Sequence, residues 1–179
     1  MVRTLLARVG GIAAIALVSA CAQTPSGPMA TMNSVSATGI GATMGTVSFA
    51  SAMGGASVRV SVKGLPAGVH GFHVHEGGSC APGLNNGAPA AAMAAGGHFD
   101  PTHAHKHMGP SGEGHLGDLP PLTVGADGSA EVTLTAPRIR DIDTLRGHAI
   151  VIHAGGDNFS DQPAPLGGGG ARIACGVIG

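Results

Sequence analysis

Gly71-Phe72-His73-Val74-His75 is the stretch of sequence that decides the fold. Two histidines two residues apart point to the same side of the chain only where the backbone is extended. Phe72 and Val74 then point to the other side. The stretch therefore predicts a strand with one apolar face and one face that carries two imidazoles, which are common metal ligands.

Alternating apolar residues on either side of this stretch predict more strands. The alternation runs through residues 46–49 and 58–63 and returns at 149–153, and residues 172–178 form a last extended segment. The turn Gly125-Ala126-Asp127-Gly128 predicts a hairpin that joins residues 122–124 to 130–135. Together these segments predict an all-β fold, a sandwich or a Greek-key barrel.

Two long stretches interrupt the strands, at residues 76–121 and 154–171, and both are rich in glycine and proline. Loops of this length are usually functional or disordered. Here they carry most of the histidines and aspartates, which favours function. An alanine-rich patch at residues 88–95 predicts a helical turn without a chemical role.

The N-terminus carries an export signal over residues 1–20, with Arg3 and Arg8 ahead of an apolar run too short to span a bilayer. Leu17-Val18-Ser19-Ala20-Cys21 resembles a bacterial lipoprotein cleavage box, in which Cys21 becomes the lipidated first residue. An ordinary signal peptide with a chance cysteine is the alternative. Either reading predicts an exported protein.

Small and polar residues without periodicity follow the cysteine. We expect residues 21–44 to comprise the lipidated Cys21 and a flexible tether, and residues 45–179 to form one domain. The next residue, Ala22, carries no acidic signal for retention in the inner membrane, so the outer membrane is preferred as the site of anchoring.

Cys80 and Cys175 remain as an even pair in an oxidising compartment, which predicts a disulfide. A bridge that closes so long a loop contributes on the order of 4 kcal/mol to stability. After removal of the signal the net charge is −3 with neutral histidines. Scattered basic residues and the absence of Trp and Tyr exclude nucleic acid as a partner.

The histidines predict two metal sites. His73, His75 and a distant His153 supply imidazoles, which copper prefers, and His98 completes that set. His107, His115 and Asp118 supply the nitrogen and oxygen donors of a closed tetrahedral zinc site. His98 is the only histidine placed to serve both.

Other histidines receive different interpretations. His70 and His148 are expected to bridge backbone groups. His103 and His105 alternate with His107 in the same loop, but only one of the three is expected to bind zinc. The other two are either solvated or recruit scarce zinc or copper.

Six ordered motifs resemble the copper/zinc superoxide dismutase family in its bacterial periplasmic form, over residues 45–179. The matching segments are Gly71-Phe72-His73-Val74-His75-Glu76, Gly96-Gly97-His98-Phe99-Asp100-Pro101, His115-Leu116-Gly117-Asp118-Leu119-Pro120, His153-Ala154-Gly155-Gly156-Asp157-Asn158, Pro165-Leu166-Gly167-Gly168-Gly169-Gly170 and Arg172-Ile173-Ala174-Cys175-Gly176-Val177-Ile178.

The resemblance implies one copper and one zinc per subunit. Copper would be bound by His73, His75, His98 and His153, and zinc by His98, His107, His115 and Asp118. It makes His98 the bridging imidazolate and proton carrier, and Asp157 the carboxylate that links a copper histidine to a zinc histidine. Cys80 and Cys175 match the family disulfide.

Arg172 stands where the family places its substrate-guiding arginine. A guanidinium beside copper would hold a small anion and keep its charge near neutral pH. A surface arginine near the C-terminus is the alternative. The resemblance thus implies dismutation of superoxide to dioxygen and hydrogen peroxide in the cell envelope, by a monomer or homodimer whose only membrane contact is the lipid.

Two rival functions remain open on the same barrel. A non-catalytic copper-binding or copper-delivery module would need neither Arg172 nor His98. An interaction domain that lost its chemistry would not need a complete ligand set.

Overall fold

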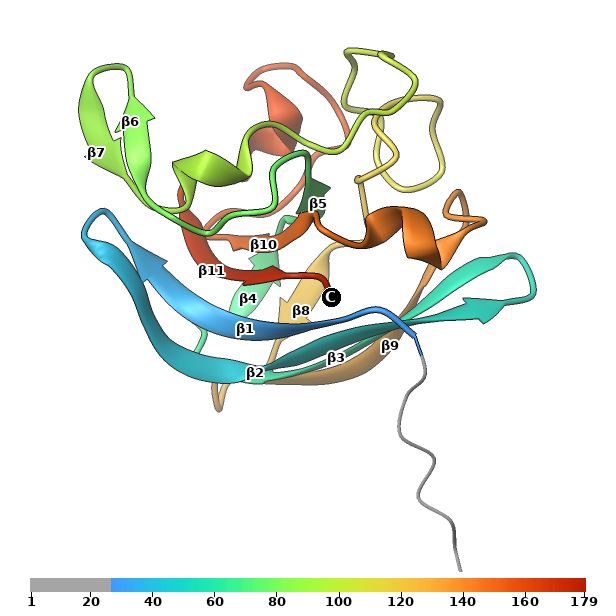
Figure 1. Cartoon of the computed structure of the whole chain (residues 1–179), viewed down its shortest axis with the longest axis horizontal. Helices are drawn as coiled ribbons and strands as arrows, with labels where there is room; N and C mark the ends of the chain where they lie inside the picture. Colours follow the sequence, from blue (N-terminus) through green and yellow to red (C-terminus); the bar gives the residue numbers. More distant parts are fainter. Residues whose placement is uncertain (1–26) are drawn as a thin grey trace, which may run out of the picture.

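The structure, a computed structural model, describes residues 27–179. An antiparallel seven-stranded sheet curls through the molecule in the order β5-β10-β11-β1-β2-β3-β9 (Figure 1). Its strands are β1 (Met29–Ser36), β2 (Gly39–Ala52), β3 (Gly55–Lys63), β5 (Phe72–His75), β9 (Ser129–Ala136), β10 (Ala149–His153) and β11 (Arg172–Val177).

Shorter elements complete the fold. Two small antiparallel pairs form from β4 (Gly68–His70) with β8 (Leu122–Val124) and from β6 (Gly83–Asn85) with β7 (Ala88–Ala90). The helices of the described chain are three 3-10 turns: η1 (Met93–Ala95), η2 (Ile142–Leu145) and η3 (Leu166–Gly168). None of the helices within residues 27–179 is long and apolar enough to cross a membrane.

Long connections give the sheet its Greek-key order. β9 returns to pair with β3, and β10 and β11 lie between β5 and β1. The predicted all-β barrel is confirmed, and so are the two long loops, which gather on one side of the curled sheet (Figure 1). The alanine-rich patch is part strand, in β7, and part helical turn, in η1.

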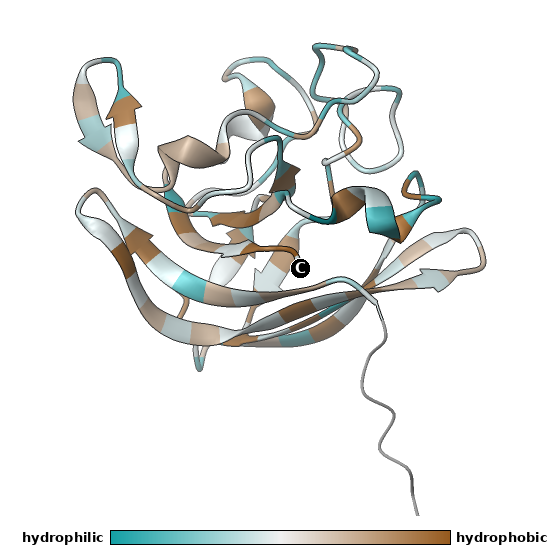
Figure 2. Cartoon of the chain, in the orientation of Figure 1, coloured by the Kyte–Doolittle hydropathy of each residue, from teal (hydrophilic) through white to brown (hydrophobic). Residues whose placement is uncertain are grey.

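Strand alternation builds the core as the sequence predicts. Val58 and Val60 on β3 are fully buried, and Val60 faces Val47 of β2 and Val132 of β9 in register. Figure 2 shows hydrophobic residues alternating with paler ones along the long strands. Burying one face of a sheet in this way fixes its register, because a slip of one residue would expose the apolar set.

The predicted tether was wrong for residues 29–44, which form β1 and the start of β2. β1 pairs with β2 on one side and with β11 on the other, and its Ala30 and Met32 are buried in the core. The segment has few large apolar residues, so its periodicity is weak. β1 is held between the next strand, β2, and the distant β11, and local sequence does not reveal the pairing with β11.

The predicted hairpin around residues 125–128 was half right. A tight turn is present, with the Gly125 N–H donating to the carbonyl of Ser129. The preceding segment, β8, pairs with β4 instead of with β9, while β9 joins the large sheet beside β3. The chain therefore passes from the small sheet to the large one at this turn, because the strands before and after it pair with different partners.

The Cys80–Cys175 disulfide is confirmed. It links the first long loop to β11, and both cysteines are buried beside Val151 of β10. Cys21 and residues 1–20 lie outside the described residues, so the structure does not bear on the export signal or the lipid.

Candidate metal centre

Strand β5 places two histidines in the site because its side chains alternate between two faces, and its apolar residues occupy the other face. Phe72 and Val74 pack in the hydrophobic core, while His73 and His75 are fully buried on the other side of the strand. The last residue of β10, His153, lies beside them, since β10 pairs with β5 in register. His98 approaches from the first long loop and forms an isolated bridge with His75.

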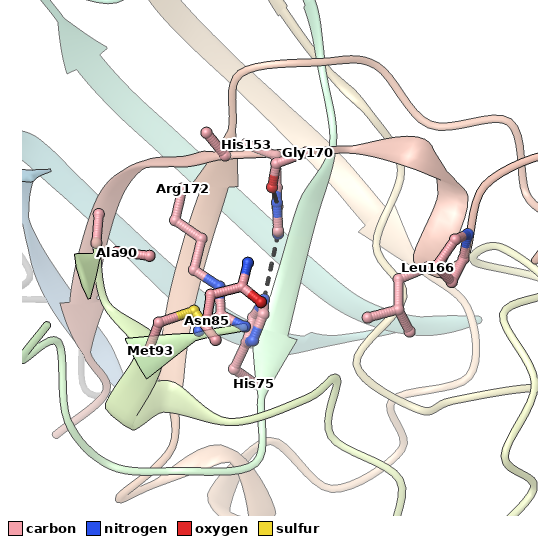
Figure 3. A pocket seen from close by; sticks show the side chains of 11 residues that line it. His75, Asn85, Ala90, Met93, His153, Leu166, Gly170 and Arg172 are labelled. Atoms are coloured by element: carbon pink, nitrogen blue, oxygen red, sulfur yellow. Dashed lines mark hydrogen bonds between the residues drawn. The ribbon is translucent and has the colours of Figure 1, made fainter. Parts of the chain in front are cut away.

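The Nε2 atom of His75 faces the Nε2 atom of His153. Their Nε2 atoms are 3.2 Å apart, and the Nδ1 of His153 lies 3.2 Å from the carbonyl of Gly170 (Figure 3). The Nδ1 of His75 lies 3.0 Å from the carbonyl of Gly96. A carbonyl only accepts, so in the neutral rings Nδ1 carries the hydrogen and both Nε2 atoms present lone pairs. Two facing lone pairs fit a cation bound by both.

His73 and His98 complete this first group. His73 donates through Nε2 to Asp157 at 2.7 Å, which leaves its Nδ1 without a hydrogen-bond partner, and His98 Nε2 is likewise buried without one. One ligand atom from each of the four histidines lies within 4.8 Å of the others. An all-imidazole set of this kind suits copper.

A second group forms around Asp118. Its carboxylate oxygens lie 2.9 Å from His98 Nδ1, 3.0 Å from His107 Nδ1 and 3.5 Å from His115 Nδ1. All four residues are buried, and His107 Nδ1 and His115 Nδ1 have no hydrogen-bond partner despite these short distances. Three nitrogens and one oxygen match the donor set of a closed zinc site.

Asp157 connects the two groups. Its side chain is fully buried, and it accepts from His73 Nε2 and His107 Nε2, both at 2.7 Å. In its neutral form each of these rings therefore has its proton on Nε2 and its lone pair on Nδ1, the nitrogen that points into the site. A carboxylate that fixes tautomer and orientation in this way raises the affinity of the rings for a metal.

Burial keeps the histidines of the first group neutral. It lowers the pKa of His73 and, by more, that of His75, and it lowers the pKa of His98 to about 4 and that of His153 to about 3. The positive charges of neighbouring groups, Arg172 among them, add to the effect at His75 and His153. These rings offer lone pairs at neutral pH.

Carboxylates dominate the second group. Burial opposes the charged form of His107, but the nearby carboxylates of Asp118 and Asp157 outweigh it and raise its pKa to about 9. Burial also opposes ionisation of both aspartates, yet hydrogen bonds from the histidines hold the pKa of each well below its usual range. The site thus favours positive charge, which a bound metal ion supplies.

A cavity of about 580 Å³ opens onto the first group. His75 and His153 lie in its wall, and Arg172 lines it with Asn85 of β6 and Met93 of η1 (Figure 3). Asn85 and Met93 were not predicted, because only the folding of the β6–β7 hairpin brings them to the cavity. The predicted position of Arg172 beside the first group agrees with this geometry.

Two backbone carbonyls hold the Arg172 guanidinium in place. It donates to the carbonyls of Ala92 and Gly96, both at 2.6 Å, and the Gly96 carbonyl also accepts from His75. A guanidinium has five N–H donors, so three remain for another acceptor. Burial lowers the pKa of Arg172 from its ordinary value of 12.5, but an arginine stays charged at neutral pH.

Two further residues support the second group from outside. Asp161 accepts the backbone N–H of His107 at 2.9 Å and that of Leu166 at 3.0 Å, so it joins the two long loops. Arg138 donates to the carbonyls of Gly114 and His115 at 2.8 and 2.9 Å. The sequence gave no signal for Arg138, whose partners lie more than twenty residues away.

The remaining histidines lie outside both groups. His70 is buried with its ring nitrogens 2.7 Å from the carbonyl of His153 and 2.8 Å from that of Pro66, which confirms the predicted bridge between backbone groups. His148 bonds through Nδ1 to a single carbonyl, that of Glu76 at 2.7 Å, so the structure shows one backbone contact of its ring and not the predicted bridge.

Comparison with protein families matches residues 43–178 to the family described as copper/zinc superoxide dismutase. A relative from Salmonella typhimurium, "Superoxide dismutase [Cu-Zn] 2", is 54% identical over 147 residues, which cover 82% of this chain and 85% of the relative. "Superoxide dismutase [Cu-Zn]" of Escherichia coli K12 is 47% identical over 93% of this chain and 96% of its own length.

Solved structures of copper/zinc superoxide dismutases also resemble this chain in fold. The Cu/Zn superoxide dismutase from Brucella abortus superposes with a TM-score of 0.83 at 48% identity, covering 84% of this chain and 98% of that one. The solution structure of the monomeric enzyme from Salmonella enterica gives a TM-score of 0.75 at 52% identity, with the same coverage.

Proposed function

Because this chain belongs to the copper/zinc superoxide dismutase family, we propose that its first histidine group holds copper, its second group holds zinc, and His98 joins them. The enzyme converts two superoxide ions and two protons into dioxygen and hydrogen peroxide, with one copper and one zinc per subunit. When bound, copper supplies the exchange of electrons, and zinc supplies a redox-inert charge that orders the loop.

The assignment of copper to one group and zinc to the other rests on His98, which the two groups share. Among the described residues, His98 belongs to both four-residue groups, with Nδ1 toward Asp118 and Nε2 toward the other histidines. A ring with one nitrogen in each group can bridge two ions. Its Nε2, buried and without a hydrogen-bond partner, is also the atom at which the protein can hold a proton for the peroxide product.

Arg172 binds the substrate in this proposal. Superoxide is a small anion, and the free N–H groups of the guanidinium line the cavity that opens onto His75 and His153. The chain has no net positive charge to attract an anion from a distance. Local charge at the cavity must therefore guide it.

Pulse radiolysis of the copper- and zinc-loaded protein tests both roles. We expect rapid copper-dependent loss of superoxide, slowed about tenfold by Arg172→Ala and less by Arg172→Lys, which keeps the charge. Copper content is measured beside the rate, because Arg172 shares the Gly96 carbonyl with His75. A loaded protein that leaves superoxide untouched would instead support the copper-handling module.

The same proposal extends to the location of the enzyme. Cys21 carries a lipid, residues 1–20 are removed, and the protein acts in the bacterial envelope as a monomer or homodimer, on the outer membrane in preference to the inner. The sequence around Cys21 supports the anchor. Mass spectrometry of the mature N-terminus tests it, since Cys21→Ser should abolish both the lipid mass and membrane recovery.

A further inference from the structure

His103 and His105 project from the first long loop outside both buried groups. Both side chains are exposed, so their ring nitrogens can be reached from solvent. Their rings stack, with centroids 5.9 Å apart and planes inclined by 28°. Two exposed imidazoles held side by side have the chemistry of a metal-binding pair, and the dismutation reaction does not use them.

Hydrogen bonds to Asp100 shape the loop that carries them. Asp100 accepts the backbone N–H of Ala104 at 3.0 Å and that of His105 at 2.8 Å, while its carbonyl accepts the N–H of His103 at 3.0 Å. His103 and His105 both have left-handed backbone, with φ of 54° and 51°. Such backbone is disfavoured for residues with side chains, so these hydrogen bonds hold a conformation that the free chain would leave.

We infer that His103 and His105 form an auxiliary surface site that captures zinc from solvent and speeds its transfer to the buried zinc ligands. Imidazole binds zinc well, and two protein ligands with water in the other positions hold it less firmly than four, so the ion can leave. His107, a residue of the second buried group, follows two residues later, at most about 7 Å along the chain. The inference concerns metal uptake and does not rest on superoxide chemistry.

Calorimetric titration of zinc into the protein already loaded with copper and zinc tests the site directly. We expect one additional equivalent to bind, and to be lost in the double variant His103→Asn/His105→Asn. Asparagine tolerates left-handed backbone, so the loop keeps its shape while both imidazoles are removed. Absence of the additional equivalent in the unmodified protein, or its persistence in the double variant, overturns the inference.

Two matched variants show whether the additional zinc binding depends on the shape of the loop or only on the number of histidines in the protein. His148→Ala removes a histidine elsewhere and should leave the additional binding unchanged. Asp100→Ala keeps both imidazoles but releases the loop, and should weaken the binding about tenfold. Equal loss in His148→Ala and in the double variant would show adventitious binding and overturn the inference.

Stopped-flow uptake of limiting zinc by the metal-free protein tests the transfer. The double variant should fill the buried site several times more slowly while reaching the same final affinity. An unchanged rate overturns the inference. Because the readout is zinc uptake, this failure is distinguishable from a failure to dismute superoxide.

Discussion

Asp157→Asn should weaken at least one of the two metal sites. The wild-type carboxylate accepts from His73 Nε2 and His107 Nε2 at 2.7 Å, and the amide of asparagine has only one oxygen to offer. Its NH₂ group therefore meets the N–H of one histidine. That ring relieves the clash by moving its proton to Nδ1, the nitrogen that points into the metal group.

The expected loss of metal affinity follows from the burial and the charge of the hydrogen bonds between Asp157 and the two histidines. Hydrogen bonds to a charged group contribute about 1.5–3 kcal/mol, and losing a residue that orients a metal ligand lowers metal affinity about 10–100-fold. The fold-change corresponds to about 1.4–2.8 kcal/mol. We expect loss in this range at the zinc site, the copper site or both, depending on which histidine keeps the oxygen.

Competition with chelators of known affinity measures each metal separately. Asp127→Asn is the matched control, because Asp127 is exposed and bonds only to Ser129 in a surface turn. It should leave both affinities unchanged. If Asp157→Asn binds copper and zinc within about twofold of the unmodified protein, the orienting role of Asp157 is refuted.

Other expectations concern stability and zinc affinity. The folded pKa values of His98 and His153, about 4 and about 3, lie below the unfolded value of 6.5, so the unfolded state binds more protons between these limits. The free energy of unfolding of the metal-free protein should rise with pH up to about 6.5, and urea melts at pH 5 and pH 7 that coincide would contradict this. Asp161→Ala removes the acceptor for two backbone N–H groups and should lower zinc affinity more than copper affinity in the chelator assay; equal loss would point to general unfolding. Reduction of Cys80–Cys175, which closes a loop of 95 residues, should lower stability by on the order of 4 kcal/mol in denaturant titration, and a shift near zero would mean that packing alone holds the loop.

Strand β5 shows how far a local pattern reaches. The alternation from Phe72 to His75 predicts an extended segment and assigns each side chain to a face, because successive residues of a strand point in opposite directions. The structure agrees, with Phe72 in the core and His73 in the metal group. The ligand residues were predicted on the same basis and on a resemblance carried by six motifs.

The terminal strand β1 shows where such patterns fail. Small residues conceal its alternation, so residues 29–44 resemble a tether until β2 and β11 are seen to pair with them. The predicted hairpin at residues 125–128 was also wrong in its pairing, because the strands on either side of the turn pair with β4 and with β3 and not with each other. Hydrogen bonds between distant segments leave little trace in either segment alone.

By itself the sequence determined the all-β class, the metal-binding residue types and the disulfide pair, because these depend on periodicity and on side-chain chemistry. Only the tertiary structure decided that Asp161 ties His107 to the second loop, that Arg138 supports His115, and that Asn85 and Met93 line the cavity beside Arg172. Each of these contacts joins residues far apart in the chain. Their distances are set by the closure of the sheet and by the packing of both loops onto it, and no local spacing encodes them.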